Sequence, residues 1–291
     1  MTGVQTCALP ICFPVTIWLA FGNKIGDTVT GAGFLAAKGV EDFAGGTAVH
    51  INAGAAGLAL ALILGKRVGW RRESMRPHSM PLVLIGAALL WFGWFGFNAG
   101  SSLGANGIAA LAFMNTQVAT AAAALGWLIV EKLRDGHPTS LGVASGAVSG
   151  LVAITPACGF VSPMGSIAIG FLAGIICALA VGLKNKFKFD DALDVVAVHL
   201  IGGVFGAIAI GFFATKMTNS AGNNGIFYGG DWTLLQHQAI AVGAVVAYSF
   251  VITYIIGKII DVIFGLRISE EAEYAGLDLS QHGETAYETA N

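Results

Sequence analysis

The sequence predicts an all-α, polytopic membrane protein, and three observations support this fold class. Of its 291 residues, 55% are hydrophobic and only 11% are charged, and the mean hydropathy is +0.74. Soluble domains are usually about 25% charged. The apolar residues gather into windows of about 20 residues, which is the length a helix needs to cross a bilayer. The 41 glycines fit helices that pack closely inside a membrane.

Seven apolar windows are long enough to be complete membrane-spanning helices. They are 44–65, 81–103, 106–130, 139–157, 163–183, 192–215 and 238–265. Residues 13–22 look like the end of an earlier span, so about seven complete spans and part of an eighth are expected. This gives a partial membrane domain over 13–266 and a cytoplasmic C-terminal tail over 267–291.

Residues 1–11 (MTGVQTCALPI) resemble one translated frame of a sequencing adapter. They also lack the basic region that begins a signal peptide. We therefore expect residues 1–12 to be a non-native artefact and the native protein to be truncated at its N-terminus. The source nucleotide read tests this expectation, because an uninterrupted native gene through the region would contradict it.

Lysine and arginine concentrate in alternate connections between the windows, and this asymmetry predicts the orientation of the spans. The basic residues are Lys66, Arg67, Arg71, Arg72 and Arg76, then Lys132 and Arg134, then Lys184, Lys186 and Lys188, and finally Lys258 and Arg267. The other connections, 101–105, 156–162 and 215–232, contain only Lys216. The basic connections and the tail are therefore expected on the cytoplasmic side.

Residues 42–54 and 191–203 are two copies of one short stretch. Each copy has an aspartate eight residues before a histidine, Ala-Val in front of the histidine, and a glycine four residues after it. The residues are Asp42, His50 and Gly54 in the first copy and Asp191, His199 and Gly203 in the second. Because the copies lie five spans apart, the repeat is inverted, with a pseudo-two-fold axis in the membrane plane.

Each histidine of the repeat then lies about 12 Å deeper than its aspartate, at 1.5 Å per residue. His50 and His199 approach the middle of the bilayer from opposite sides, where an ionisable residue indicates function. The alternative is that each histidine only bonds a neighbouring helix. Asp191 stands beside Asp190 at a helix start and is expected to cap it, whereas for Asp42 both capping and ligand contact remain open.

Further motifs follow in order along the chain. They are 42–53 (DFAGGTAVHINA), 93–101 (GWFGFNAGS), 115–122 (NTQVATAA), 155–159 (TPACG), 194–199 (DVVAVH), 265–271 (GLRISEE) and 282–284 (HGE). From about residue 13 to the end, the sequence resembles the ammonium transporter (Amt/Mep/Rh) family, and within it the bacterial Amt branch.

The resemblance implies an eleven-span fold with inverted five-span repeats, assembled as a homotrimer with one pore per subunit. This chain would begin within span four. The family works without a cofactor, lies in the bacterial inner membrane among its lipids, and carries ammonium or ammonia. Composition alone favours a flexible tail, whereas the resemblance implies a structured tail that offers a docking surface for a PII-family regulatory protein.

The family's functional residues fall on particular positions of this sequence. The twin pore histidines fall on His50 and His199, the outer-site serine on Ser101, the inner gate phenylalanine on Phe97, the conducting-helix tryptophan on Trp94, and the structural or recruitment acid on Asp42. The second gate phenylalanine belongs to a span that is missing. The outer-site tryptophan has no secure match, because different alignments leave Trp18, Ala20, Phe21 or Thr30.

The resulting hypothesis is an ammonium transporter that recruits ammonium at an outer site and passes ammonia through a histidine-lined pore. Cation–π contacts and the Ser101 hydroxyl would stabilise the cation at the mouth. A membrane ammonium sensor with the same fold is the alternative, and an Rh-like gas channel is a third. An enzyme is not expected, because the sequence has no nucleophile elbow or phosphate loop and its four cysteines lack metal-ligand spacing. No basic cluster suggests nucleic acid.

Overall fold

The computed structural model describes residues 24–25, 28–29, 33–73 and 75–285. The predictions made for residues 1–12 and 13–22, and the outer-site alternatives Trp18, Ala20, Phe21 and Thr30, lie outside these residues. The described part is helical apart from a hairpin of two short antiparallel strands, β1 (Lys24–Ile25) and β2 (Thr28–Val29).

All seven apolar windows coincide with helices. They are the π-helical turn η1 (Gly46–Ile51) with α3 (Asn52–Leu64), α4 (Met80–Gly100), α5 (Gly107–Asp135), α6 (Ser140–Ile154), α7 (Pro163–Ala180), the π-helical turn η2 (Val196–Ile201) with α9 (Gly202–Phe213), and α10 (Trp232–Phe264). The shorter helices are α2 (Phe34–Ala37), α8 (Leu183–Phe187), η3 (Ile226–Tyr228), α11 (Glu270–Ala275) and η4 (Asp278–His282).

Among the described residues, six helical segments are long and apolar enough to cross a membrane, and α6 is a shorter apolar helix. The window 139–157 contains only the 15 residues of α6, because Pro156 follows its C-cap and cannot continue the helix. Helices α5 and α10 are longer than their windows, since their polar ends remain helical beyond the apolar residues.

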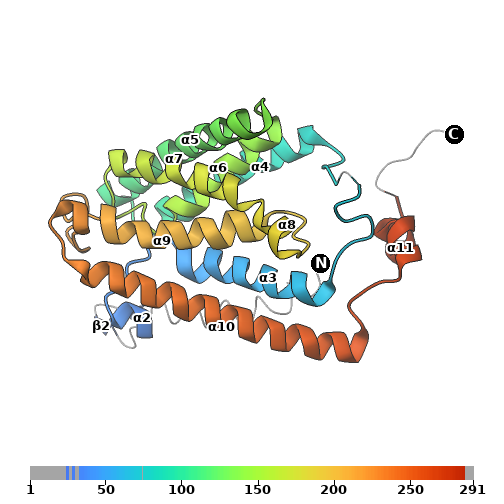
Figure 1. Cartoon of the computed structure of the whole chain (residues 1–291). Helices are drawn as coiled ribbons and strands as arrows, with labels where there is room; N and C mark the ends of the chain where they lie inside the picture. The colour runs from blue at the N-terminus through green and yellow to red at the C-terminus, as the bar shows by residue number, and fades with distance from the viewer. Residues whose placement is uncertain (1–23, 26–27, 30–32, 74, 286–291) are drawn as a thin grey trace.

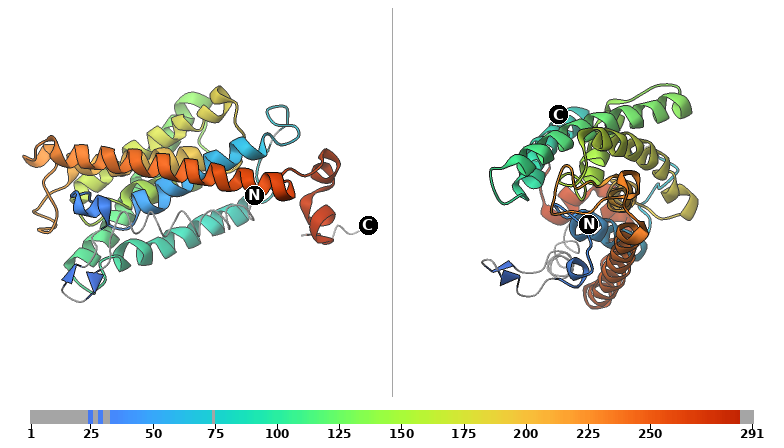
Figure 2. Two further views of the ribbon diagram at one scale, coloured as in Figure 1. Left: turned by 90° about the horizontal axis from the view of Figure 1, so that it is seen from below. Right: turned by 90° about the vertical axis from the view of Figure 1, so that its left-hand side faces the viewer.

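The two copies of the repeat run in opposite directions. Figure 1 shows η1–α3 passing from left to right and η2–α9 from right to left, so the inversion predicted from the sequence is present in the fold. Helix α10 lies along α3 and runs in the same direction, as Figure 2 also shows. The ends of α3 and α10 and all of α8 therefore lie at one end of the molecule. Basic residues gather there, because Lys66 and Arg67 follow α3, Lys184 and Lys186 lie in α8, and Lys258 lies near the end of α10.

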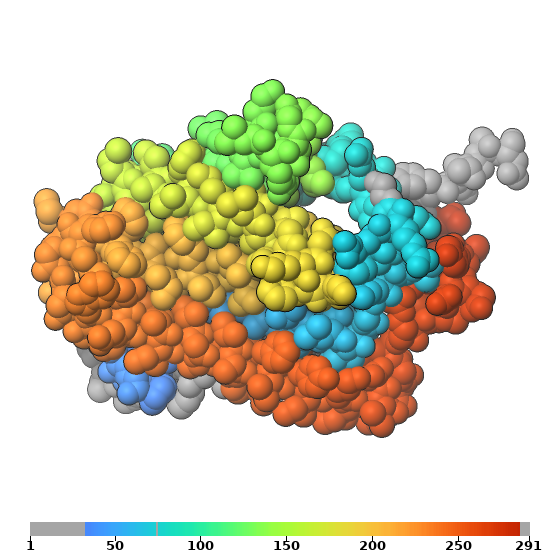
Figure 3. Space-filling model, in the orientation of Figure 1, coloured from blue at the N-terminus to red at the C-terminus, as the bar shows by residue number. Residues whose placement is uncertain are grey.

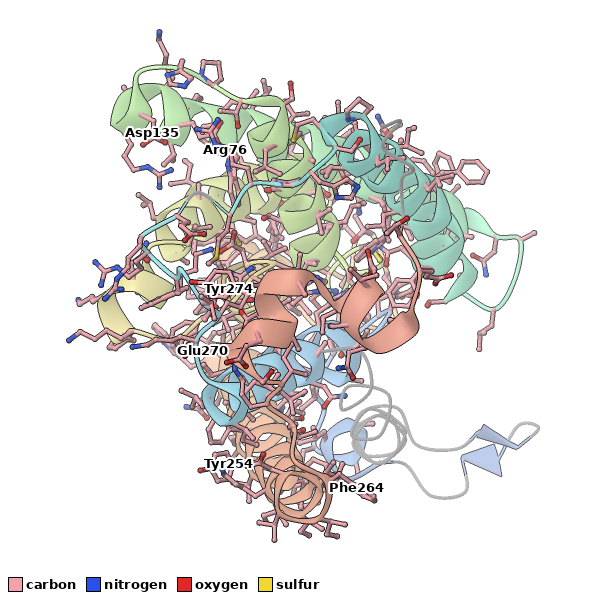
Figure 4. The ribbon with its side chains drawn as sticks, turned by 90° about the vertical axis from the view of Figure 1, so that its right-hand side faces the viewer. Arg76, Asp135, Tyr254, Phe264, Glu270 and Tyr274 are labelled. Atoms are coloured by element: carbon pink, nitrogen blue, oxygen red, sulfur yellow. The ribbon has the colours of Figure 1, made fainter. Side chains whose placement is uncertain are left out.

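Residues 267–285, the part of the C-terminal tail that the structure describes, form short helices, and α11 lies against this basic end. A structured tail agrees with the family resemblance and differs from the flexible tail that composition alone favours. Glu273 of α11 accepts a hydrogen bond from the backbone N–H of Val68 (2.8 Å) and forms an ion pair with Arg267. Figure 4 looks onto this end and shows Glu270 and Tyr274 on α11 and Phe264 at the end of α10.

An ion pair between half-exposed Arg67 and buried Asp190 links the same end to the second copy of the repeat. The Arg67 guanidinium donates to both carboxylate oxygens of Asp190, at 2.8 and 2.7 Å, and its backbone N–H donates to Asp190 as well. In Figure 3 the yellow surface of α8, which precedes Asp190, lies beside the blue-to-cyan surface at the end of α3. The segment after α3 is thereby fixed to the segment that leads into η2.

Candidate functional site

Each histidine of the repeat lies in a π-helical turn, His50 in η1 and His199 in η2. Such turns inside α-helices are rare and occur frequently at functional sites. In both copies the turn is followed directly by a regular helix, α3 or α9. A π-helical turn is wider than an α-helical one, so it changes the direction in which the histidine side chain leaves the helix. The periodicity of the sequence does not indicate that such a turn is present.

The glycine of each copy lies where the two oppositely directed helices cross. A Cβ atom added at Gly54 would stand 2.4 Å from the backbone nitrogen of Leu200, the residue after His199. A Cβ atom added at Gly203 would stand 3.3 Å from the Cβ of His50. Both glycines therefore allow the close approach that brings the histidine-bearing turns together.

The aspartates of the two copies have matching hydrogen bonds. Asp42 accepts from the backbone N–H groups of Gly46 (2.6 Å) and Thr47 (2.8 Å), four and five residues later. Asp191 accepts at the same spacings, from Val195 (3.1 Å) and Val196 (2.8 Å). Each carboxylate thus binds the free N–H groups that begin a helix, which is a capping arrangement.

Asp42 makes two further hydrogen bonds that the second copy lacks. Its carboxylate also accepts from the backbone N–H of Gly45 (3.0 Å) and from the Thr47 hydroxyl. The carboxylate is buried and occupied by these four donors, all of which come from the start of η1. Its contacts are therefore those of a residue that fixes the position of the turn bearing His50.

The two histidine rings meet inside the protein. The Nδ1 atoms of His50 and His199 are 3.4 Å apart, and the ring centroids are 5.4 Å apart. His50 is buried and His199 is half-buried, and the Nε2 atom of His50 has no hydrogen-bond partner among the described residues. The pair can share one proton between its Nδ1 atoms and still offer further ring nitrogens to a small polar molecule.

Aromatic residues of α4 cover one side of the histidine pair. The Trp94 ring stacks on the His50 ring with centroids 5.1 Å apart, and the Phe97 ring lies 6.1 Å from His50. Trp94 is held in place because its indole N–H donates to the Thr155 hydroxyl at 2.8 Å. Trp94 is buried, whereas Phe97 is 38% exposed, so Phe97 stands at the edge of the cluster.

Ser101 lies one turn beyond Phe97, at the C-cap of α4. Its hydroxyl donates to the Phe97 carbonyl oxygen at 2.8 Å, so the lone pairs of the oxygen remain able to accept from a ligand. The side chain is half-buried. Ser101, Phe97, Trp94 and the histidine pair therefore follow one another from the end of α4 toward the interior.

Comparison with known proteins identifies the family. A model of the Ammonium Transporter Family matches residues 6–287 of the chain. The chain belongs to the ammonium transporter family. An ammonium transporter of Mycobacterium bovis is 50% identical over 287 residues, which cover 96% of this chain and 60% of the relative. The ammonium transporter Amt1 of Archaeoglobus fulgidus is 48% identical over 272 residues, covering 93% of the chain and 68% of the relative.

Solved structures of the family have the same fold. Candida albicans Mep2 superposes with a TM-score of 0.82 at 35% identity, covering 92% of this chain and 59% of that protein. A protein described as a sensor Amt protein gives a TM-score of 0.83 at 30% identity, covering 93% of this chain and 67% of that protein. The chain is therefore a multi-pass membrane protein of the ammonium transporter family, and its named relatives are transporters rather than enzymes.

Sequence reasoning missed several residues that build the site of this ammonium transporter family member. Thr155 positions Trp94, and Thr47 holds Asp42. Asp194 adopts a left-handed backbone conformation just before η2. Thr155 and Asp194 lie in motifs that the sequence singled out, but nothing in residue type or spacing indicates their contacts.

Proposed function

We propose that this protein carries ammonium across a membrane by admitting it at an outer site and conducting ammonia past His50 and His199. The observation that supports this function best is the pairing of the two histidines by an inverted repeat, with their Nδ1 atoms 3.4 Å apart. The chain spans 60% of the Mycobacterium bovis transporter, so the proposal concerns the whole protein of which these helices are a part.

The outer site is proposed to stabilise a cation that the bilayer interior cannot hold. An isolated buried charge costs tens of kcal/mol in the Born limit. The Ser101 hydroxyl can accept one hydrogen bond from ammonium, and the face of Phe97 adds cation–π attraction of about 0.5–2 kcal/mol. Phe97 then acts as a gate between this site and the histidine pair.

Below the gate, ammonium gives up a proton and continues as ammonia. Apolar walls disfavour the charged form, and the rings of His50 and His199 can accept from or donate to the neutral molecule. One Nδ1 carries a proton and the other accepts it, so the pair also offers a route by which the released proton can pass. Potassium has no proton to release, and this difference supplies selectivity.

The proposed setting is the bacterial inner membrane, with the basic connections and the C-terminus in the cytoplasm. The basic residues at the end shared by α3, α8 and α10 support this orientation. We further propose a homotrimer surrounded by membrane lipid, in which each subunit has its own pore. Glu273 in the tail accepts a hydrogen bond from the backbone N–H of Val68. The tail therefore lies on the proposed cytoplasmic face, where a PII-family regulatory protein could dock.

The test uses a full-length protein in which a relative supplies the segment preceding this chain. Ammonium uptake and ammonium-dependent current are measured for the unchanged protein and for His50→Ala and His199→Ala. His237→Ala is the matched control, because His237 lines a cavity of about 510 Å³ beside the start of α10 that neither His50 nor His199 lines. We expect His50→Ala and His199→Ala to lose ammonium transport or to change its selectivity, and His237→Ala to do neither. Unchanged ammonium-specific transport in both His50→Ala and His199→Ala refutes the proposal.

A membrane ammonium sensor is the second candidate. The similarity to the protein described as a sensor Amt protein, at a TM-score of 0.83, is the observation that favours it. A sensor binds ammonium at the same outer site without sustained transport. Saturable binding with no uptake by the full-length protein would support the sensor over the transporter.

A further inference from the structure

The two copies of the repeat share an unusual backbone conformation five residues before each histidine. Gly45 has φ 103° and Asp194 has φ 55°, and the two positions are equivalent in the repeat. Glycine adopts the left-handed region freely, whereas a Cβ atom disfavours it, although less for aspartate and asparagine than for other residues. The second copy therefore holds a non-glycine residue in a conformation that favours glycine.

This conformation immediately precedes the helical segment that contains each turn, because η1 begins at Gly46 and the helix that leads into η2 begins at Val195. The carbonyl oxygen of Gly45 accepts from the backbone N–H of Val49 at 2.8 Å, and that of Asp194 accepts from Val198 at 2.9 Å. Val49 and Val198 each stand one residue before the histidine, so these hydrogen bonds link the left-handed residue to the turn that carries the histidine. A change of backbone conformation at residue 194 would therefore turn His199 relative to His50.

An ion pair holds Asp194 in place. The ammonium group of Lys184, in α8, lies 2.6 Å from Asp194 Oδ1, and the two side chains are 24% and 31% exposed. The same ammonium group lies 3.3 Å from the carbonyl oxygen of Asp191. Lys184 therefore contacts two residues, Asp191 and Asp194, of the segment that leads into η2.

The first copy has no counterpart of this ion pair, because a glycine and a threonine stabilise its turn instead. Its left-handed residue is a glycine, and the Thr47 hydroxyl gives Asp42 an extra donor. The equivalent of Thr47 is Val196, which has no hydroxyl group. The Lys184–Asp194 pair therefore takes the place of the glycine and the threonine of the first copy.

We propose that Lys184 and Asp194 are positioning residues for His199. The ion pair keeps residue 194 in the left-handed conformation, and this sets the turn that presents Nδ1 of His199 to His50. The inference rests on the proposed function for its transport readout. It also predicts that Lys184 becomes dispensable once residue 194 is a glycine.

Four variants of the full-length protein test this proposal. Lys184→Met is expected to lower ammonium uptake severalfold, whereas Asp194→Gly retains most of it. The double variant Lys184→Met with Asp194→Gly is expected to match Asp194→Gly, because glycine needs no ion pair to remain left-handed. Lys186→Met is the matched control, since it removes a charge from the same helix and Lys186 forms no salt bridge among the described residues.

A second readout does not depend on transport. Diethyl pyrocarbonate modifies accessible histidines, and mass spectrometry gives the rate at His199 with His237 as the internal reference. Lys184→Met is expected to raise the rate at His199, and the double variant to restore it. The proposal is overturned if Lys184→Met lowers uptake and raises modification of His199 equally whether residue 194 is aspartate or glycine. It is also overturned if Lys184→Met has no effect on either measurement. Absence of uptake by the unchanged protein would instead count against the proposed function.

Discussion

The substitution Gly54→Ala tests how closely the two repeat copies must approach. The added Cβ atom would stand 2.4 Å from the Leu200 nitrogen and 2.6 Å from its Cα, so the backbone beside His199 must retreat by about 1 Å to reach ordinary van der Waals contact. The Nδ1–Nδ1 distance of 3.4 Å is already near the limit of a hydrogen bond. A shift of this size therefore separates the rings.

Two consequences of Gly54→Ala are expected. Overpacking of this kind costs about 1–3 kcal/mol of stability, which thermal unfolding in detergent measures. Misplacement of reacting groups by about 1 Å can lower a rate on the order of a hundredfold, so ammonium uptake by the full-length protein should fall at least tenfold by the same reasoning.

Two other glycines provide controls for this substitution. A Cβ atom at Gly203 meets its nearest atom, the Ile51 side chain, at 3.1 Å, so Gly203→Ala is expected to have a smaller effect. A Cβ atom at Gly86, on α4, meets no atom within 4 Å, and Gly86→Ala should leave uptake unchanged. If Gly54→Ala transports ammonium as well as Gly86→Ala, the close crossing is not required.

Three further predictions concern groups around the histidine pair. Asp42→Ala leaves three backbone N–H groups without their acceptor and should cost about 3 kcal/mol or more in thermal unfolding; Asp42→Asn, which keeps one carbonyl oxygen, should cost less, and equal costs would contradict the capping role. Burial opposes ionisation of Asp190, but its hydrogen bonds with Arg67 outweigh burial and lower its pKa. The ion pair should therefore stabilise the protein above the ordinary aspartate pKa of about 3.9 and lose this contribution as the pH falls below it. The unfolding temperatures of the unchanged protein and Asp190→Asn should converge in acid, and a constant difference would refute this. Trp94→Phe removes one hydrogen bond, worth about 1 kcal/mol, but keeps an aromatic ring against His50, so uptake should survive better than in Trp94→Ala.

The sequence predicted the helices and the inverted repeat well, because both depend on patterns that residue order carries directly. Apolar windows locate helices, and the spacing of Asp42, His50 and Gly54 recurs at Asp191, His199 and Gly203. The window 139–157 was expected to hold a complete span, but α6 ends at Ile154 before Pro156. Hydropathy averages over a window and does not register the point at which a proline stops the helix.

The local geometry of the candidate site could not be predicted. The π-helical turns around His50 and His199 follow a capping aspartate and a left-handed residue. Capping by Asp191 was expected from the sequence, but nothing in the sequence indicates the wider turn. The stacking of Trp94 on His50 depends on contacts between helices 44 residues apart in sequence number. The link from Arg67 to Asp190 joins two connections, and only the folded chain brings them together.

The central claim is that two imidazole rings from oppositely directed helices meet within one protein-lined conduit. A cryo-electron microscopy map of the full-length protein in lipid nanodiscs tests it most directly. The nitrogens of His50 and His199 are expected to lie within hydrogen-bond reach, with Trp94 stacked on the His50 ring and protein on every side. Rings that point apart, or that face lipid, would contradict it.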